Sequence, residues 1–273
     1  MMDGNGLLAG VPAGSVRVSG WLSPSADAPE GAVDWLVPEE VPVAITLNGS
    51  TLAVMMATPA DLEDFGIGFA VAEGVLADVA AIEDIAVLDD CNGMVVHLSA
   101  APSRVREEAI RSRTLAGRSG CGLCGVDSLD GAVRWPGQQV RPLTVTAQAV
   151  QRALALLPEY QPMNRLNRSV HAAAWCQPDG TVMLAREDVG RHNALDKLIG
   201  ALLRAGISPA DGFVVMTSRC SFELVQKAAA AGIPVLATLS SPTALALRLA
   251  DAAGLTVLSA HRGGRVVRFN TPA

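Results

Sequence analysis

The last third of the chain alternates strands with helices, and this alternation limits the possible folds more than any other feature. Apolar runs at 213–217, 234–239 and 255–260 predict strands, and the segments between them, 222–231 and 243–253, predict helices. Strands joined by helices of this length pair in parallel through right-handed crossovers. We therefore expect an α/β fold with a parallel βαβαβ unit in its C-terminal part.

Parallel sheets bind ligands beyond the carboxyl ends of their strands, and several polar loops fall at those ends. The loops expected there are 187–193, 217–221, 240–243 and 261–265. Ser218, Arg219 and Ser241 precede predicted helices, whose first backbone amides can receive a phosphate. The simpler alternative is a set of ordinary capping serines and a polar surface turn. Because all the loops share one edge, the sequence favours a ligand that carries phosphate.

Two histidines lie near this edge. His192 belongs to a charged run with Glu187, Asp188 and Arg191, which is either a catalytic cluster or an ion-paired turn, and spacing does not separate the two. His171 lies inside an apolar strand, where a hydrogen-bonded core histidine is the expected interpretation. We retain His192 as a candidate ligand-binding residue.

The first half of the chain predicts a smaller, β-rich unit. Strands at 41–47 and 51–57 flank Asn48-Gly49, a dipeptide typical of tight hairpins. Thr58 and Pro59 then suit the N-cap and the first position of a helix that would end near residue 76. We therefore expect an N-terminal β-hairpin followed by a helix.

The remaining segments complete a three-part organisation. Further strands are expected at 85–88, 94–98, 170–175 and 181–185, further helices at 147–157 and 194–204, and an irregular polar stretch at 158–168. Residues 1–37, rich in Gly, Pro, Ser and Ala, are expected to be a flexible tail with at most one short strand. The rest divides into an N-terminal part, 38–143, and a C-terminal α/β part with the ligand edge, 144–273.

The stretch Arg118-Ser119-Gly120-Cys121-Gly122-Leu123-Cys124-Gly125 holds two cysteines two residues apart. Three glycines in six residues disfavour helix and strand and predict an accessible loop. Arginines upstream, from Arg104 to Arg118, favour the thiolate form of a cysteine, which is its nucleophilic form. We therefore expect Cys121 and Cys124 to carry sulfur chemistry.

Other roles for this cysteine pair fit less well. A structural zinc needs about four ligands, usually in two close pairs, and the other cysteines and the four histidines are scattered singly, so no metal site is expected. A thioredoxin-like pair should follow a strand and open a helix early in the domain, whereas this pair lies mid-chain before Gly125. Five cysteines, an odd number, argue against a structural disulfide.

Composition excludes several classes of protein. The net charge of −6 argues against broad nucleic-acid binding, and half of the 273 residues are hydrophobic, as in a globular protein. The longest apolar stretch, 65–82, is interrupted by Glu73 and Asp78, so no membrane span is expected. The N-terminus has no basic segment before an apolar run, so we expect no signal peptide and a cytoplasmic protein.

Four stretches of the chain together resemble the FdhD family, the sulfur carrier proteins needed for formate dehydrogenase activity. They are 117–125 around the cysteines, 170–173, 187–197 and 218–229. Thr58-Pro59-Ala60-Asp61 and Glu73-Gly74 also fit the family pattern. The resemblance covers about residues 37 to 269, and the run EDVGRHNALDK at 187–197 is long and specific.

The resemblance implies a function for the cysteine loop. A cysteine desulfurase would hand sulfur to Cys121 as a persulfide, with Cys124 assisting, so the chain would be a sulfurtransferase. The sulfur would then pass to the molybdenum of bis-molybdopterin guanine dinucleotide, before that cofactor enters formate dehydrogenase. The family's cofactor-binding stretch aligns with Ala260-His261-Arg262-Gly263-Gly264-Arg265. The implied fold is a cytidine-deaminase-like three-layer sandwich, and the implied assembly is a homodimer.

A second function, from a different class, stays open. The chain could be a non-catalytic chaperone that binds the cofactor or the dehydrogenase, with the cysteine pair serving redox chemistry or zinc binding. Deamination is not implied by the fold, because zinc deaminases need His-x-Glu and Pro-Cys-x-x-Cys arrangements. Here Ala173 lies two residues after His171, and Gly120 precedes Cys121.

Overall fold

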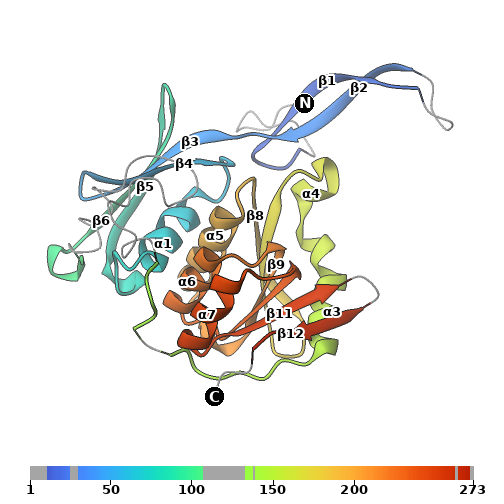
Figure 1. Ribbon diagram of the computed structural model, residues 1–273. Helices are drawn as coiled ribbons and strands as arrows, with labels where there is room; N and C mark the ends of the chain where they lie inside the picture. Colours follow the sequence, from blue (N-terminus) through green and yellow to red (C-terminus); the bar gives the residue numbers. More distant parts are fainter. Residues whose placement is uncertain (1–10, 25–29, 107–132, 138, 262–263, 271–273) are drawn as a thin grey trace.

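The computed structural model of the protein describes residues 11–24, 30–106, 133–137, 139–261 and 264–270. Within these ranges it contains a six-stranded sheet, a four-stranded sheet and a two-stranded hairpin, with helices packed between and around them (Figure 1). None of the helices in the described ranges is long and apolar enough to cross a membrane.

The six-stranded sheet is the centre of the C-terminal part, with the strand order β12-β11-β10-β9-β7-β8. Its strands are β7 (His171–Cys176), β8 (Val182–Asp188), β9 (Phe213–Arg219), β10 (Val235–Ser240), β11 (Thr256–His261) and β12 (Arg265–Arg268). β10 pairs in parallel with both β9 and β11, and the crossover helices are α6 (Phe222–Ala230) and α7 (Ala244–Ala253). The predicted parallel βαβαβ unit is therefore confirmed.

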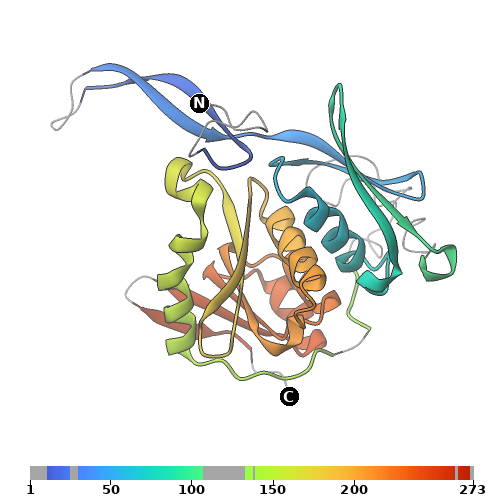
Figure 2. The ribbon, with the colours of Figure 1, turned by 180° about the vertical axis from the view of Figure 1, so that it is seen from behind.

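Helices cover both faces of this sheet, which forms the middle of three layers (Figures 1 and 2). On one face, α5 (Arg191–Arg204), α6 and α7 bury an apolar cluster that includes Leu195 and Leu249. On the other face, α3 (Ala147–Leu156) buries Val150 against the strands. A mixed α/β layered fold is thus found, and its cytidine-deaminase-like character stays a prediction.

The N-terminal part is a four-stranded sheet with one helix beneath it. The strand order is β4-β3-β6-β5, with β3 (Val41–Leu47), β4 (Ser50–Ala57), β5 (Ile82–Asp90) and β6 (Gly93–Ala100). Asn48 and Gly49, at φ 49° and 81°, form the predicted turn between β3 and β4. α1 (Leu62–Ala72) buries Phe65 and Phe69 against the sheet, so the predicted hairpin plus helix is confirmed.

α1 also packs against α5, and two glycines allow the close approach of these helices. A Cβ atom at Gly68 would lie 1.7 Å from the carbonyl oxygen of Asp196, and one at Gly200 would lie 1.9 Å from that of Asp64. Any side chain at either position would therefore push the helices apart. This crossing joins the N-terminal part to the six-stranded sheet, because α5 belongs to the layer that covers it.

Residues 15–22 and 31–38 form two antiparallel strands where the sequence predicted a flexible tail with at most one short strand. β1 (Ser15–Leu22) pairs with β2 (Gly31–Pro38) along its whole length. The hairpin projects from the body of the molecule and leads into β3 (Figures 1 and 2). We call this hairpin the arm. The prediction failed because the Gly, Pro and Ser content of the segment hid the apolar alternation of its strands.

The helix start after β4 also differs from the prediction. α1 begins at Leu62 and ends at Ala72, and Thr58 does not cap it. The hydroxyl oxygen of Thr58 instead accepts a hydrogen bond from the backbone N–H of Val189 at 3.2 Å. Local sequence rules assign the side chain of Thr58 to the helix cap, but a tertiary hydrogen bond to Val189 uses it instead.

The stretch predicted to be irregular, 158–168, is largely helical. It holds most of η4 (Leu157–Tyr160) and all of α4 (Pro162–Asn167), and Pro162 at the first helical position was a signal for the second of these. The other predicted strands and helices lie close to their expected bounds, and Thr146 caps α3 as predicted. Short 3-10 turns are η1 (Val79–Ala81), η2 (Pro102–Arg104) and η5 (Pro209–Asp211).

Candidate functional site

The four loops predicted to share one edge of the sheet do share it. β8 and β9 both run antiparallel to β7, so β8, β9, β10 and β11 all point the same way. These strands end at Asp188, Arg219, Ser240 and His261, and β7 begins at the same edge with His171. The N-termini of α5, α6 and α7 follow β8, β9 and β10 directly and therefore lie there too. We call this the carboxyl edge.

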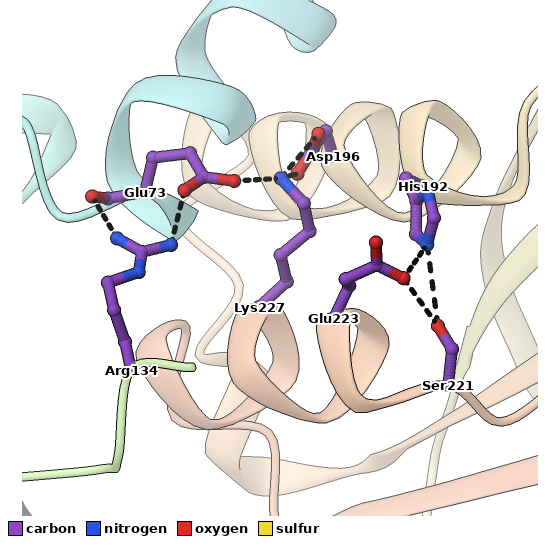
Figure 3. Close-up of polar contacts among 7 residues, drawn as sticks. All are labelled: Glu73, Arg134, His192, Asp196, Ser221, Glu223 and Lys227. Carbon is purple, nitrogen blue, oxygen red and sulfur yellow. Dashed lines mark hydrogen bonds and ion pairs between the residues drawn. The ribbon is translucent and has the colours of Figure 1, made fainter. Parts of the chain in front are cut away.

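His192, Ser221 and Glu223 form a hydrogen-bonded group at the carboxyl edge (Figure 3). His192 Nε2 lies 2.9 Å from Glu223 Oε2 and 3.4 Å from Ser221 Oγ, and Ser221 Oγ donates to the same carboxylate oxygen at 3.1 Å. Because the serine and the carboxylate contact the same ring nitrogen, the group is not a serine–histidine–acid relay. It fixes the orientation of the imidazole at the start of α5.

The ionisation of Glu223 follows from these contacts. Burial opposes the charged form of this carboxyl, but the hydrogen bonds and charge of His192 and the hydrogen bond from Ser221 outweigh burial and lower the pKa of Glu223. The group therefore presents an ionised carboxylate that holds the histidine in place.

One helical turn further along the same helices lies a buried charge network. Lys227 Nζ lies 2.9 Å from each carboxylate oxygen of Asp196 and 2.6 Å from Glu73 Oε1. Asp196 follows His192 by four residues on α5, and Lys227 follows Glu223 by four residues on α6. Residues four apart are neighbours on one helix face. The network and the His192 group therefore lie next to each other (Figure 3).

Burial and the two carboxylates around Lys227 determine which groups of this network are charged. Burial raises the pKa of Asp196 to about 6, and the charge of Glu73 adds to that rise while Lys227 opposes it. Burial lowers the pKa of Lys227, but the two carboxylates outweigh it and raise the pKa above its usual value. Lys227 is therefore held in its charged form by two acidic partners.

The predicted sulfur carriers, Cys121 and Cys124, lie outside the described residues, but the chain on either side of them is described. Before the cysteines, Arg106 donates its backbone N–H to the carbonyl oxygen of Val75 at 2.9 Å. After them, Arg134 Nη1 donates to the carbonyl oxygen of Glu73 at 2.7 Å, and Nη2 binds the Glu73 carboxylate. Both flanks of the cysteine segment therefore attach directly after α1.

Glu187 and Asp188, which the sequence left as either catalytic or ion-paired, bind other structural elements. Asp188 accepts a hydrogen bond from Thr58 N at 3.0 Å and pairs with the fully buried Lys197 at 2.6 Å. Glu187 accepts from the first two backbone amides of α4, at 2.8 and 2.9 Å. Both carboxylates are thus engaged by other parts of the fold, and His192 stays the candidate ligand residue of the run.

A cavity of about 390 Å³ opens at the carboxyl edge, on the side of the sheet that α3 and α4 cover. Its walls include Gln161, His171 and Thr217, together with apolar side chains such as Leu157 and Leu239. Gln161 is 4% exposed, and its Nε2 has no hydrogen-bond partner among the described residues. The volume is that of a small-molecule site, and Gln161 is a buried polar side chain in its wall.

His171 enters the cavity as a neutral group. Burial lowers the pKa of this histidine, and the positive charges of Arg191 and His192 lower it further. The negative charge of Asp188 raises the pKa, but by less. His171 was expected to be a hydrogen-bonded core residue. It is instead half-buried at the start of β7 and lines the cavity.

The predicted ligand residues on β9 and after β10 lie along the edge without lining this cavity. Ser218 is buried, and its hydroxyl donates to the carbonyl oxygen of Arg219 at 3.0 Å. Arg219 and Ser241 are exposed at the ends of their strands. The hydroxyl of Ser218 is therefore already engaged, whereas Arg219 and Ser241 are accessible.

The predicted cofactor stretch spans the end of β11 and the start of β12. Ala260 is buried beneath α3, and His261 pairs with Arg265 across the turn. Gly264 has φ 75°, a backbone conformation that favours glycine. Arg262 and Gly263 lie outside the described residues. Ala260 is thus a core residue, and the accessible part of this stretch begins at His261.

Two of the three other cysteines, Cys176 and Cys220, are buried and are poor nucleophiles. Burial raises the pKa of Cys176 and of Cys220 to about 12 each, and thiols in that state react slowly because the thiolate is the nucleophile. Cys91 is exposed between β5 and β6. In the described ranges, no group of three or more His, Cys, Asp or Glu residues could hold a metal ion.

A model of the family described as FdhD/NarQ matches residues 38–273. The chain belongs to the FdhD/NarQ family. A relative from Xanthomonas campestris pv. campestris, named "Sulfur carrier protein FdhD", is 46% identical over 237 residues, which are 87% of this chain and 84% of the relative. A relative of the same name from Bordetella parapertussis is 45% identical over 239 residues, 86% of each chain.

A solved structure shares the FdhD/NarQ fold of this chain. It is described as a "putative formate dehydrogenase accessory protein" from Desulfotalea psychrophila, with a TM-score of 0.71 and 24% sequence identity. The match covers 94% of this chain and 97% of that one. The family resemblance seen in the sequence is therefore confirmed, and the family match begins at residue 38, where the arm ends.

Sequence reasoning missed the buried network and the cavity of this FdhD/NarQ protein. Glu73 and Lys227 occurred in the stretches that carried the resemblance, but nothing in their spacing placed them together. The four-residue steps from His192 to Asp196 and from Glu223 to Lys227 were the available signal. Gln161 escaped notice because its segment was predicted to be irregular.

Proposed function

We propose that this protein is a sulfur carrier. It accepts persulfide sulfur from a cysteine desulfurase on Cys121 and passes that sulfur to bis-molybdopterin guanine dinucleotide, before the cofactor enters formate dehydrogenase. The observation that carries the proposal is the attachment of both flanks of the cysteine segment beside α1, where Glu73 contacts Lys227, one helical turn from the His192 group. Relatives named as sulfur carrier proteins support the same function.

The first step is an exchange between sulfur atoms. The thiolate of Cys121 attacks the terminal sulfur of the desulfurase persulfide, so that a new S–S bond forms on Cys121 as the old one breaks. The desulfurase cysteine leaves as a thiolate, and no electrons are gained or lost overall. Cys124, three positions away in the chain, assists as the neighbouring thiol.

The second step needs the cofactor at the carboxyl edge. The N-termini of α5, α6 and α7 carry backbone amides that lack partners within their helices, and such amides favour phosphate. Arg219 and Arg265 are exposed at the same edge and add positive charge. The cofactor is the substrate of this edge, and its phosphates match what the edge offers.

The guanine base suits the neighbouring cavity. Purine bases are flat and carry hydrogen-bond acceptors on their edges, and the cavity combines apolar walls with the buried amide of Gln161. A base acceptor would give Gln161 Nε2 the partner that it lacks among the described residues. Phosphate sites and a base site would then lie at one edge of one sheet.

The experiment that tests this function compares Cys121→Ala with Cys91→Ala in a strain that lacks the protein. Formate dehydrogenase activity and guanine-nucleotide binding by the purified variants are both measured. We expect Cys121→Ala to abolish dehydrogenase activity with nucleotide binding intact, and Cys91→Ala to behave as wild type because Cys91 lies outside the paired-cysteine stretch, in the exposed turn between β5 and β6. Full activity in the Cys121→Ala strain would rule out transfer and leave a binding chaperone.

A further inference from the structure

Glu187 and Asp188 are neighbours at the end of β8, which is an edge strand of the six-stranded sheet. Successive side chains of a strand project to opposite faces of the sheet. Ala185 packs with the apolar cluster on the α3 face, whereas Leu184 packs with the cluster under α5. By the same alternation, Glu187 points to the α3 face and Asp188 to the α5 face. Both side chains are buried, with 4% and 0% of each residue exposed.

On the α3 face, Glu187 takes the role of a helix cap for α4. The first N–H groups of a helix have no partner inside it, and Pro162, the first residue of α4, has no N–H. Glu187 Oε2 accepts a hydrogen bond from the N–H of Met163 at 2.8 Å, and Oε1 accepts one from the N–H of Asn164 at 2.9 Å. The side chain of Gln161, at the N-cap position, makes no cap hydrogen bond among the described residues. One carboxylate from another element therefore completes the start of this helix.

The position of α4 decides the shape of the cavity at the carboxyl edge. Gln161 and Asn164 both line this cavity of about 390 Å³, and the other walls come mainly from α3, η4 and the strands of the sheet. α4 has six residues, and a helix this short is not stable on its own. It therefore depends on contacts with the rest of the fold, and Glu187 holds it through the backbone of a residue that lines the cavity.

On the α5 face, Asp188 shapes the first turn of α5. Its Oδ1 atom accepts hydrogen bonds from the N–H of Gly190 at 2.7 Å and from Asn193 Nδ2 at 2.9 Å. Gly190 directly precedes the helix, and a Cβ atom there would lie 2.8 Å from Asn193 Nδ2, so this turn favours glycine. His192 lies between these two contacts, in the turn whose backbone N–H groups have no partner within the helix. Asp188 therefore fixes the part of α5 that faces the carboxyl edge with free amides.

The fold compensates the charge of both acids. Asp188 pairs with the fully buried Lys197 at 2.6 Å, and each oxygen of the Glu187 carboxylate accepts a backbone N–H. A free carboxylate at this edge would repel the phosphates of an anionic ligand. The two acids are therefore explained by the elements that they hold and not by contact with a ligand.

We propose that Glu187 and Asp188 are positioning residues for the two halves of one ligand site. Glu187 holds the cavity wall that receives the base, and Asp188 holds the first turn of α5, which receives a phosphate. The inference rests on the proposed function, because the ligand is the guanine nucleotide proposed there. Each acid acts on a separate part of that ligand through the element that it binds.

Calorimetry with guanosine diphosphate and with inorganic pyrophosphate separates the two halves, because pyrophosphate carries the phosphates without the base. We expect Glu187→Gln to weaken the binding of guanosine diphosphate about tenfold, since the new side chain keeps one acceptor oxygen and turns an N–H₂ donor toward an amide of α4. Pyrophosphate binding should stay within about twofold of wild type, because the half of the site that Asp188 holds is untouched. The matched control is Glu159→Gln, which changes an exposed carboxylate of η4 and should leave both affinities as they are.

Asp188→Asn should weaken both ligands by a similar factor of about ten, because the phosphates are common to both. This change also leaves Lys197 without its carboxylate, so Gly190→Ala serves as a second variant that disturbs the same turn without uncovering a buried charge. Circular dichroism identifies the variants that are folded, and the affinities are compared among these.

Electrostatics makes the test sharper. Glu187→Gln and Asp188→Asn each remove a negative charge near an anionic ligand, so charge alone predicts tighter binding, and weaker binding reports lost positioning. An unchanged or tighter affinity of Glu187→Gln for guanosine diphosphate would overturn the proposal, as would an equal loss of both ligands in that variant. Unchanged pyrophosphate binding by Gly190→Ala, or a wild type that binds guanosine diphosphate but not pyrophosphate, would overturn it too. A wild type that binds neither ligand would instead refute the nucleotide site of the proposed function.

Discussion

Arg134 binds Glu73 twice, through the backbone carbonyl and through the carboxylate, and so ties the chain that returns from the cysteine segment to the end of α1. The other carboxylate oxygen of Glu73 is held by Lys227 at 2.6 Å. A cation on either side therefore fixes Glu73 in place. The position at which the cysteine segment rejoins the fold is thus set by a charge network buried between α1, α5 and α6 (Figure 3).

Removing Arg134 should impair sulfur loading without disturbing the nucleotide site. We expect Arg134→Ala to slow the gain of persulfide from a cysteine desulfurase several-fold, because the contacts that attach the C-terminal flank of the cysteine segment to Glu73 are lost. Guanine-nucleotide binding should stay as in wild type. The matched control is Arg141→Ala, since Arg141 forms an exposed pair with Asp211. Time-resolved intact mass spectrometry measures the loading. Equal rates for the two variants would refute a positioning role for Arg134.

Replacing Lys227 should destabilise the whole fold. Lys227→Met leaves Asp196 buried without its cation, beside a Glu73 carboxylate that keeps Arg134, and breaking a buried pair in this way costs about 3–5 kcal/mol. The control, Arg152→Ala, removes an exposed pair with Asp179 and should cost less than about 1 kcal/mol. Urea denaturation gives both values. A loss for Lys227→Met no larger than that of the control would contradict the network as described.

Asp196 should give the stability of the protein a definite pH dependence. Its pKa is about 6 in the folded protein, above the ordinary value of 3.8, so between these pH values the folded state binds a proton that the unfolded state does not. This group therefore contributes stability below about pH 4 that is lost as the pH rises through about 6.

The variant Asp196→Asn isolates that contribution. We expect the free energy of unfolding of wild type, minus that of the variant, to fall as the pH is raised from about 4 to about 6 and then to level off. Denaturation curves at a series of pH values in one buffer system measure it. A difference that rises with pH would mean that the carboxyl is ionised more easily in the folded state, against this account.

Gln161 should decide how well the cavity holds a guanine base. We expect Gln161→Leu to weaken the binding of guanosine diphosphate about tenfold in calorimetry, because the buried amide donor is lost while the apolar volume is kept. Gln177→Leu, at an exposed position, serves as the control. Arg262→Ala should also weaken binding if its loop contacts the phosphates. Unchanged affinity for Gln161→Leu would remove the cavity from the nucleotide site.

Local sequence rules predicted the elements that local physics determines. The hairpin at Asn48-Gly49, the cap at Thr146 and the βαβαβ alternation all depend on neighbours in the chain, and all were found. Thr58 was misassigned because its hydroxyl binds Val189, which is 131 residues away and invisible to a local rule. The shared edge of the four loops was predictable, since strand direction alone places them there.

The buried charges could not be predicted in the same way. The two lysines of the chain, Lys197 and Lys227, are both buried, although lysine is among the residues least often found inside. Lys197 on α5 pairs with Asp188 at the end of β8. Lys227 on α6 meets Asp196 of α5 and Glu73 after α1 because these three helices pack together. The arm was not predicted for a different reason. Its Gly, Pro and Ser content concealed the alternation of apolar residues in its strands.

The central claim is that Cys121 receives sulfur, and intact mass spectrometry tests it most directly. Wild type, Cys121→Ala and Cys124→Ala are each incubated with an active cysteine desulfurase and cysteine, and the masses are compared before and after reduction. We predict a reducible gain of one or more sulfur atoms in wild type that maps to Cys121 and is absent from Cys121→Ala. An unchanged mass in wild type, with the desulfurase shown to be active, would contradict the sulfur-carrier account and favour a binding chaperone.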